Sequence, residues 1–437
     1  MKALITLLRM ACLSLVAISV LAACSTGESS TDEIDGEAEL EPGQKELRVA
    51  WWGSQARHER TLAAIELFEE KNPDIVVTTE YSGWDGYWER LSTQAAGRNL
   101  PDVIQMDFQY LNEYVSRDLL LGLNEFINSG ELNFDDVDDL YLDGGKVDNE
   151  LYAVNLGANS LAFAYDPVMF EEAGVAELEP GYTWDDYLAA IRKINSELDG
   201  VYAAGLGDLH SFKHYLRQHD LWLYNEEHTG LGYDDDQYFI DFFSMYKALL
   251  DEGVAAGPGI VADIQGMEDE LIVHGEASTL LLHSNQIVEL HHAANRPVKL
   301  SMYPSMSGGT EAHFLKPSMF FSATEHTNHS EEAIRFIDFF TNDLEANEIL
   351  NAERGVPISE KVRGHIYDDL DEYEQMQFDY IELIEEHSTP IHPPEPSGTG
   401  EINDAFERLM QELQYDMITV EEFAERFRQE VDNVLAN

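Results

Sequence analysis

The sequence is poor in cysteine and in basic residues, and both shortages exclude classes of protein. Its 437 residues include 2 Cys, Cys12 and Cys24, and we expect Cys12 to be removed with an N-terminal signal. Disulfides and cysteine-ligated metals are therefore not expected in the mature chain. The 84 Asp and Glu outnumber the 26 Lys and Arg, which gives a formal net charge of −58. Because such a surface repels phosphate groups, nucleic acid is not an expected partner.

The sequence also lacks the short motifs of common enzymes and cofactor sites. It contains no H-E-x-x-H, no G-x-S-x-G, no phosphate-loop G-x-x-x-x-G-K and no G-x-G-x-x-G. The Asp-rich runs at 135–139 and 234–236 lack the spacing of a calcium loop, and His283, His291 and His292 include no pair four residues apart. We interpret these groups as solvated surface. The sequence therefore predicts no metal, no cofactor and no catalytic residues, so we expect a protein that is not an enzyme.

A folded body is nevertheless expected in spite of the charge. Hydrophobic residues make up 44% of the chain, and 20 Phe, 20 Tyr and 6 Trp are spread along it. That apolar area can offset the entropy lost on ordering, which excludes an acidic disordered chain. A chain of this length suits two or three domains rather than one.

The N-terminus reads as a signal peptide of a lipid-anchored protein. Residues 1–23 combine Lys2 and Arg9 with an apolar run at 10–21, and the segment at 21–24, Leu-Ala-Ala-Cys, resembles the lipobox of bacterial lipoproteins. The resemblance implies that Cys24 carries the lipid and that the body lies outside the cytoplasm, at the outer face of the cell membrane. The alternative is a chance cysteine after a plain signal. Residues 24–45 are acidic and without apolar periodicity, as expected of a flexible tether.

The body alternates short strands with amphipathic helices. Leu47, Val49 and Trp51 share one face of a predicted strand, and further strands are predicted at 75–79 and 103–106, with a helix between the first two. This alternation predicts parallel βαβ units, whose ligands bind outside the carboxyl ends of the strands. The middle, 166–259, is predicted mainly helical, with Thr183 as an N-cap. Strands are predicted again at 278–283 and 298–302, and helices from about 402 to 434.

Several segments, taken in order, resemble the extracellular solute-binding protein family 1, the sugar-binding lipoproteins of ABC importers that include maltose-binding protein. They are residues 51–57, 84–88, 101–107, 163–166, 182–184, 275–286 and 354–359. The resemblance implies an α/β, two-lobed periplasmic-binding-protein-like fold with a hinge and a central ligand cleft. It places one lobe at 46–157 plus 319–365 and the other at 158–318 plus 366–437.

A sugar has an apolar face that stacks on aromatic rings and a rim of hydroxyls that need polar partners. Candidate platforms are Trp52, Trp84, Trp184 and Trp222, although for Trp184 a place in the core beneath a helix N-terminus is favoured. Candidate polar and charged contacts, carried over by matched segment or by their nearness to the expected cleft, are Gln55, Arg57, Asp107, Tyr110, Asn159, His283, Ser284, Asn285, Gln286, Lys316, Thr399, Gly400 and Glu401. Alternatives stay open: Ser284–Gln286 as an ordinary turn, Arg57 as a helix-start charge, and Trp222 in a helical core.

The expected function is capture of an oligosaccharide and its delivery to an ABC permease by a monomer. The cations Arg57, His283 and Lys316 stand out in so acidic a chain and suggest a uronate-containing ligand. The alternatives are a secreted, lipid-anchored carbohydrate-active enzyme and a sugar-sensing partner of a receptor. The overall acidity suggests adaptation to a salty medium, with an alkaline habitat as the alternative.

Overall fold

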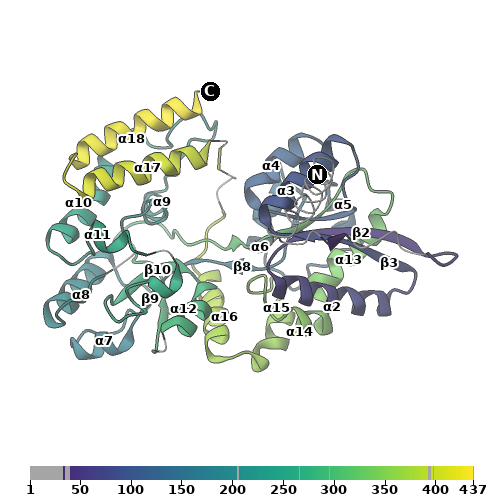
Figure 1. Ribbon diagram of the computed structural model, residues 1–437, viewed down its shortest axis with the longest axis horizontal. Coiled ribbons are helices and arrows are strands. Elements are labelled where there is room, and N and C mark those ends of the chain that lie inside the picture. Colours follow the sequence, from purple (N-terminus) through teal and green to yellow (C-terminus); the bar gives the residue numbers. More distant parts are fainter. Residues whose placement is uncertain are drawn as a thin grey trace, which may run out of the picture.

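The structure is a computed structural model that describes residues 33–34, 40–203, 206–264, 266–294, 296–391, 395–396 and 398–436. The predicted signal at 1–23, Cys24 and most of the predicted tether at 24–45 lie outside the described residues. The described part forms two α/β lobes side by side, with the purple strands β2 and β3 in one and the yellow helices α17 and α18 in the other (Figure 1).

The first lobe is built on a six-stranded sheet of order β1-β3-β2-β4-β13-β7. β2 runs parallel to both β3 and β4, as the βαβ pattern predicts, whereas β13 is antiparallel to β4 and β7. Its elements are β1 (Glu33–Ile34), β2 (Lys45–Trp52), α2 (Gln55–Lys71), β3 (Ile75–Ser82), α3 (Trp84–Ala96), β4 (Val103–Met106), α4 (Phe108–Ser116), α5 (Asn124–Ser129), α6 (Asp139–Leu142), β5 (Lys146–Val147), β6 (Glu150–Leu151), β7 (Val154–Asn155), β13 (Phe320–Ala323), α13 (Ser330–Asn342), α14 (Leu344–Leu350) and α15 (Glu360–Ile366).

The second lobe has a three-stranded antiparallel sheet of order β10-β9-β11 surrounded by helices. Its core is rich in aromatic rings from α9, α10, α17 and α18, such as Phe212, Phe243 and Phe427, each with no exposed surface. Its elements are β9 (Leu161–Tyr165), α7 (Pro167–Glu172), α8 (Trp184–Glu197), α9 (Leu209–Gln218), α10 (Gln237–Asp251), α11 (Pro258–Val261), β10 (Thr279–His283), α12 (Gln286–Ala294), β11 (Lys299–Ser301), α16 (Glu372–Glu385), α17 (Thr399–Gln414) and α18 (Val420–Leu435). Short 3-10 turns lie at Asp143–Gly145, Met267–Asp269 and Tyr367–Asp369.

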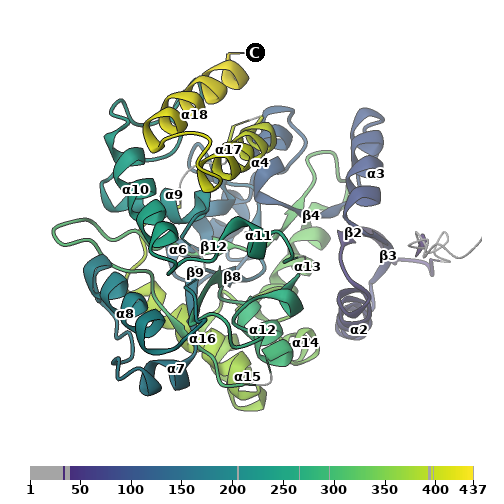
Figure 2. The same ribbon diagram turned by 60° about the vertical axis from the view of Figure 1, so that its left-hand side comes forward.

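The chain passes between the lobes through β8 (Ala158–Asn159) and β12 (Lys316–Pro317), which pair antiparallel. Ala158 also pairs with Val356, so three segments far apart in sequence meet there. β8 lies between the lobes in Figure 1, and in Figure 2 it lies close to β12. The predicted boundaries of the second lobe, 158 and 318, place β8 and β12 at its edge. These boundaries stay predictions.

Among the described helices, none combines the length with the apolar character that a membrane-spanning segment requires.

Candidate functional site: a cavity lined by cations

A cavity of about 620 Å³ lies between the lobes. One wall comes from the first lobe, where Asp107, Phe108 and Gln109 begin α4. The opposite wall is formed by α9 and by α17 of the second lobe, and Lys316 and Pro317 of β12 close the side nearest the lobe crossing. The cavity therefore borders both lobes and the strand that joins them.

One face of α9 supplies four of the lining side chains. Asp208 caps the helix, because its carboxylate accepts the backbone N–H of Ser211 at 2.9 Å. Residues three, four and seven apart share a helix face, and His210, Lys213, His214 and Arg217 follow that spacing and all line the cavity. The other face of α9 is apolar and packs in the lobe core.

Arg217 is buried in the cavity wall, with 6% of its surface exposed, and has no carboxylate partner among the described residues. Its Nε donates to the carbonyl of Ala312 at 2.7 Å and its Nη2 to that of Pro390 at 3.2 Å. The guanidinium carbon lies 4.3 Å from the ring centre of Trp222 and 4.6 Å from that of Phe314. Burial lowers the pKa of Arg217 to about 9. The positive charge is thus held by carbonyl groups and aromatic rings.

Lys316 is the second cation that lines the cavity without a carboxylate partner among the described residues. Its ammonium makes no ion pair or hydrogen bond within the described part of the chain, although Asp107 across the cavity and Glu395 attract it from farther away. Burial lowers the pKa of Lys316, and burial likewise raises the pKa of Asp107. Asp107 is further engaged as the N-cap of α4, where it accepts the N–H of Gln109 at 3.0 Å.

Four of the residues predicted from the sequence line this cavity: Asp107, Trp222, His283 and Lys316. They come from α4's N-terminus, the loop after α9, the end of β10 and β12. The fold therefore brings together side chains that are up to about two hundred residues apart in the chain. Their predicted role in binding stays a prediction.

Three predicted residues of the first lobe, Trp52, Trp84 and Tyr110, lie instead in an aromatic cluster outside the cavity lining. The ring centres of Trp52 and Trp84 are 5.0 Å apart, and those of Trp84 and Tyr110 are 6.3 Å apart. Trp52 is 7% exposed and packs among its neighbours, whereas Trp84 is 37% exposed. Of the two predicted platforms in this lobe, only Trp84 offers much free surface.

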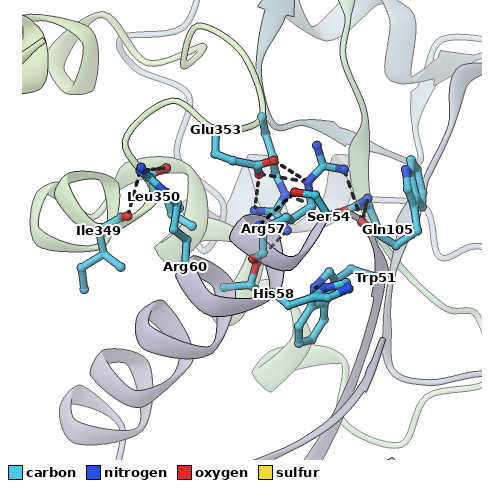
Figure 3. A network of polar contacts seen from close by, with 12 residues as sticks. Trp51, Ser54, Arg57, His58, Arg60, Gln105, Ile349, Leu350 and Glu353 are labelled. Atoms are coloured by element: carbon cyan, nitrogen blue, oxygen red, sulfur yellow. Dashed lines mark hydrogen bonds and ion pairs between the residues drawn. The ribbon is translucent and has the colours of Figure 1, made fainter. Parts of the chain in front are cut away.

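Arg57 does not face the cavity, because a carboxylate of its own lobe holds it. Its Nε donates to both carboxylate oxygens of Glu353, at 3.0 and 2.9 Å, as Figure 3 shows. Arg354 is buried beside this pair and donates to Gln105 at 3.3 Å. The network thus connects α2 and β4 to the segment before Val356, next to the lobe crossing.

The other predicted residues also lie outside the lining, and most make local contacts. Gln55 is exposed and donates to Glu59, while the buried Asn159 has an Oδ1 without a hydrogen-bond partner. Ser284 accepts the N–H of Ser160, Gln286 accepts that of His283, and Asn285 is exposed. Thr399 donates to the carbonyl of Pro396, and Gly400 and Glu401 are exposed in the first turn of α17. The cavity reaches α17 farther along, from Asn403 to Gln414.

The cavity-lining face of α9, with His210, Lys213, His214 and Arg217, was missed by sequence reasoning. The signal is present at 210–217, His-Ser-Phe-Lys-His-Tyr-Leu-Arg, where basic or titratable residues recur at helical spacing in a chain with few cations.

No group of three or more His, Cys, Asp or Glu side chains that could hold a metal occurs among the residues that the structure describes.

Comparisons with known proteins agree with this architecture. A profile of the family described as bacterial extracellular solute-binding protein matches residues 63–375. A binding protein of Brucella abortus is 23% identical over 287 residues, which are 64% of this chain and 68% of that protein.

Two solved structures are similar over nearly the whole chain. The extracellular solute-binding protein family 1 member from Alicyclobacillus acidocaldarius is 29% identical, with a TM-score of 0.82 over 91% of this chain and 100% of that one. A periplasmic oligogalacturonide-binding protein from Yersinia enterocolitica is 27% identical, with a TM-score of 0.77 over 90% and 99%. The latter is also solved with saturated digalacturonic acid, at 28% identity and a TM-score of 0.70 over 90% and 98%. This chain therefore belongs to the bacterial extracellular solute-binding proteins.

Proposed function

We propose that this protein binds an acidic, uronate-containing oligosaccharide in the cavity between the lobes and delivers it to an ABC permease. The observation that carries the proposal is the presence of two cations, Arg217 and Lys316, in the cavity without a carboxylate partner among the described residues. The chain has 84 carboxylate side chains against 26 cations. Leaving a cation unpaired in such a chain costs desolvation energy that an anionic ligand would recover.

The rest of the lining suits a sugar. Trp222 and Phe314 supply apolar rings beside the charges, and α17 contributes the amides of Asn403, Gln411 and Gln414. Aromatic rings stack on the C–H face of a sugar, and amides pair with its hydroxyls. A ligand placed here would contact both lobes, so lobe closure would bury it.

The similarity to the oligogalacturonide-binding protein of Yersinia enterocolitica supports the same ligand class. That similarity extends over 90% of the chain at 27% identity, which is enough for a shared fold but leaves the binding residues to be tested.

Isothermal titration calorimetry with digalacturonate and with digalactose, its neutral counterpart, tests the proposal. Digalacturonate should bind more tightly, and at about 100 times its dissociation constant it should add about 2.7 kcal/mol to the free energy of unfolding. Equal affinity for the two sugars, or tighter binding of the neutral one, would contradict an acidic ligand.

We also propose that binding occurs without turnover. The ligand recovered after prolonged incubation should be unchanged. Appearance of new reducing ends from a longer oligogalacturonide would favour the enzyme alternative and would overturn this part of the proposal.

A lipid on Cys24 is the proposed attachment to the membrane. Cys24→Ala should release the protein into the medium, because the lipid would be the anchor. Metabolic labelling of the wild type with palmitate is the matched check. A Cys24→Ala variant that stays with membranes after a high-salt wash would contradict the lipobox reading.

A further inference from the structure

Two histidines, His210 on α9 and His283 at the end of β10, face the cavity with their rings. Their ring centres are 5.9 Å apart and the rings are nearly perpendicular. Neither ring makes a hydrogen bond or an ion pair within the described part of the chain, and both line the cavity. By contrast, His365 is paired with Glu348 and His387 with Glu311. The cavity pair is therefore open to a ligand.

The charged groups around His210 and His283 affect whether the two rings carry a proton when no ligand is bound. They are Asp208 at the N-cap of α9, Lys213 on α9, Lys316 on β12, Glu395, Glu407 on α17 and, across the cavity, Asp107. The nearest carboxylates are already engaged, since Asp208 accepts from the N–H and the hydroxyl of Ser211 at 2.9 Å each. Glu395 accepts from the ammonium of Lys213. Asp208 and Glu395 still raise the pKa of His210 by their charge, but the loss of hydration together with the charges of Lys213 and Lys316 outweighs them.

The neutral form of both rings follows from this environment. Burial lowers the pKa of His283 to about 3, and the charge of Lys316 lowers it further in the same direction. Loss of hydration between the walls of the cavity, and then the charge of Lys213, lower the pKa of His210. His210 is exposed toward the cavity and His283 is half-buried, so a group that enters the cavity can reach both.

The geometry points to His210 and His283 as the residues that distinguish acidic from neutral sugars, by taking up a proton when a ligand carboxylate enters beside Lys316. This inference rests on the proposed function. The proton comes from the buffer and forms an N–H bond on a ring nitrogen, and that N–H donates to a carboxylate oxygen. No bond of the sugar breaks. A hydroxyl group carries no charge, so a neutral sugar gives no reason for the uptake.

Proton uptake makes the affinity depend on pH. A ligand carboxyl has a pKa of about 3.5 and stays ionised above about pH 5.5, so it contributes no proton. Each ring has one pKa without ligand and a higher pKa with ligand. As the pH is lowered between these two values, the dissociation constant should fall by up to about tenfold per pH unit for each proton taken up.

The test is calorimetry of the mature protein with digalacturonate from about pH 8 to about pH 5.5, at each pH in two buffers that hold that pH and differ in ionisation enthalpy. We expect tighter binding at lower pH and a buffer-dependent heat that reports proton uptake. The double variant His210→Gln, His283→Gln should lose both effects. His326→Gln, on an exposed loop of the first lobe, is the control and should keep both.

The failures are distinguishable. If digalacturonate binds with the same affinity at all pH values and without buffer dependence, the inference is overturned while the proposed function stands. If the double variant keeps the uptake, the two histidines are not its source. If no acidic sugar binds at any pH, both proposals fall. If the double variant does not fold, NMR of the wild type with isotope-labelled histidine rings replaces it. The pKa values of His210 and His283 must then rise on saturation with digalacturonate.

Discussion

Lys316 is the residue on which the account of ligand charge depends most. Its ammonium is unpaired among the described residues and borders the cavity from β12. We predict that Lys316→Met weakens binding of digalacturonate about 10- to 100-fold, because a hydrogen bond to a charged group contributes about 1.5–3 kcal/mol. Binding of a neutral sugar should change little. Calorimetry of both ligands measures the difference.

Lys361→Met is the matched control, since Lys361 is exposed at the start of α15 and outside the cavity lining. The ligand-free Lys316→Met variant should also melt at a higher temperature than the wild type, because it no longer carries an unpaired, half-buried charge. An unchanged affinity for digalacturonate would remove Lys316 from the site.

His313 makes stability depend on pH. It is 4% exposed, and burial lowers its pKa from 6.5 to about 3. Between these values the unfolded chain binds the proton and the folded chain does not, so the free energy of unfolding falls as the pH is lowered. From pH 7 to pH 5, His313→Gln should show a shallower fall than the wild type, by up to about 1.4 kcal/mol per pH unit. Urea unfolding measures it, with His326→Gln as the control; identical slopes for all three proteins would refute the prediction.

Single residues could be predicted where their role is local. Thr183 was predicted as an N-cap, and it forms a capping box with Asp186. Trp184 was predicted to be core, and it is 8% exposed with its indole N–H bonded to Gln218. The cavity face of α9 was not predicted, because which face of a helix borders a cavity depends on the packing of the other lobe.

At the scale of elements, periodicity identified strands and helices but not their pairing. The alternation of Leu47, Val49 and Trp51 predicted β2, and all three are fully buried. The apolar spacing from Ile402 to Leu413 predicted α17, whose buried residues follow it. The insertion of the antiparallel β13 between β4 and β7 was not predicted, since its pairing with β4 joins segments more than two hundred residues apart.

Gly355 gives a test at the crossing of the lobes. Its φ is +106°, and a Cβ there would lie 3.2 Å from the carbonyl oxygen of Ala158 in β8. Gly355→Ala should therefore lower the free energy of unfolding by about 1–3 kcal/mol. Gly364→Ala, inside α15 with no heavy atom within 4 Å of the new Cβ, should raise it by about 0.5–1 kcal/mol. Chemical denaturation of the two variants measures their free energies of unfolding. An unchanged free energy of unfolding for Gly355→Ala would contradict the prediction and would show that the backbone at the lobe crossing rearranges to accept the new Cβ.

At the scale of the whole molecule, the fold was predicted through an ordered set of family-like segments rather than through composition. The two α/β lobes and the mixed sheet of the first lobe confirm the predicted fold class. The ligand could only be narrowed to a class from sequence, because the cavity unites side chains from α4, α9, β10, β12 and α17 whose nearness exists only in the folded chain.

The net charge of −58 leads to a prediction about salt. Ion pairs can engage only a minority of 84 carboxylates with 26 cations, so most remain to repel one another. At about 1 M salt the Debye length falls to about 3 Å and screens this repulsion. The melting temperature of the mature protein should rise by several degrees between about 0.05 M and 1–2 M NaCl, equivalent to about 1 kcal/mol or more. A flat or falling curve would contradict adaptation to salt.

The most direct measurement is a crystal structure of the mature protein with digalacturonate. We predict that the sugar lies in the cavity between α4 and α9, with a carboxylate within about 3 Å of the ammonium of Lys316. A sugar bound instead on the aromatic cluster around Trp84, with no ligand atom near Lys316 or Arg217, would show that the cavity is not the binding site.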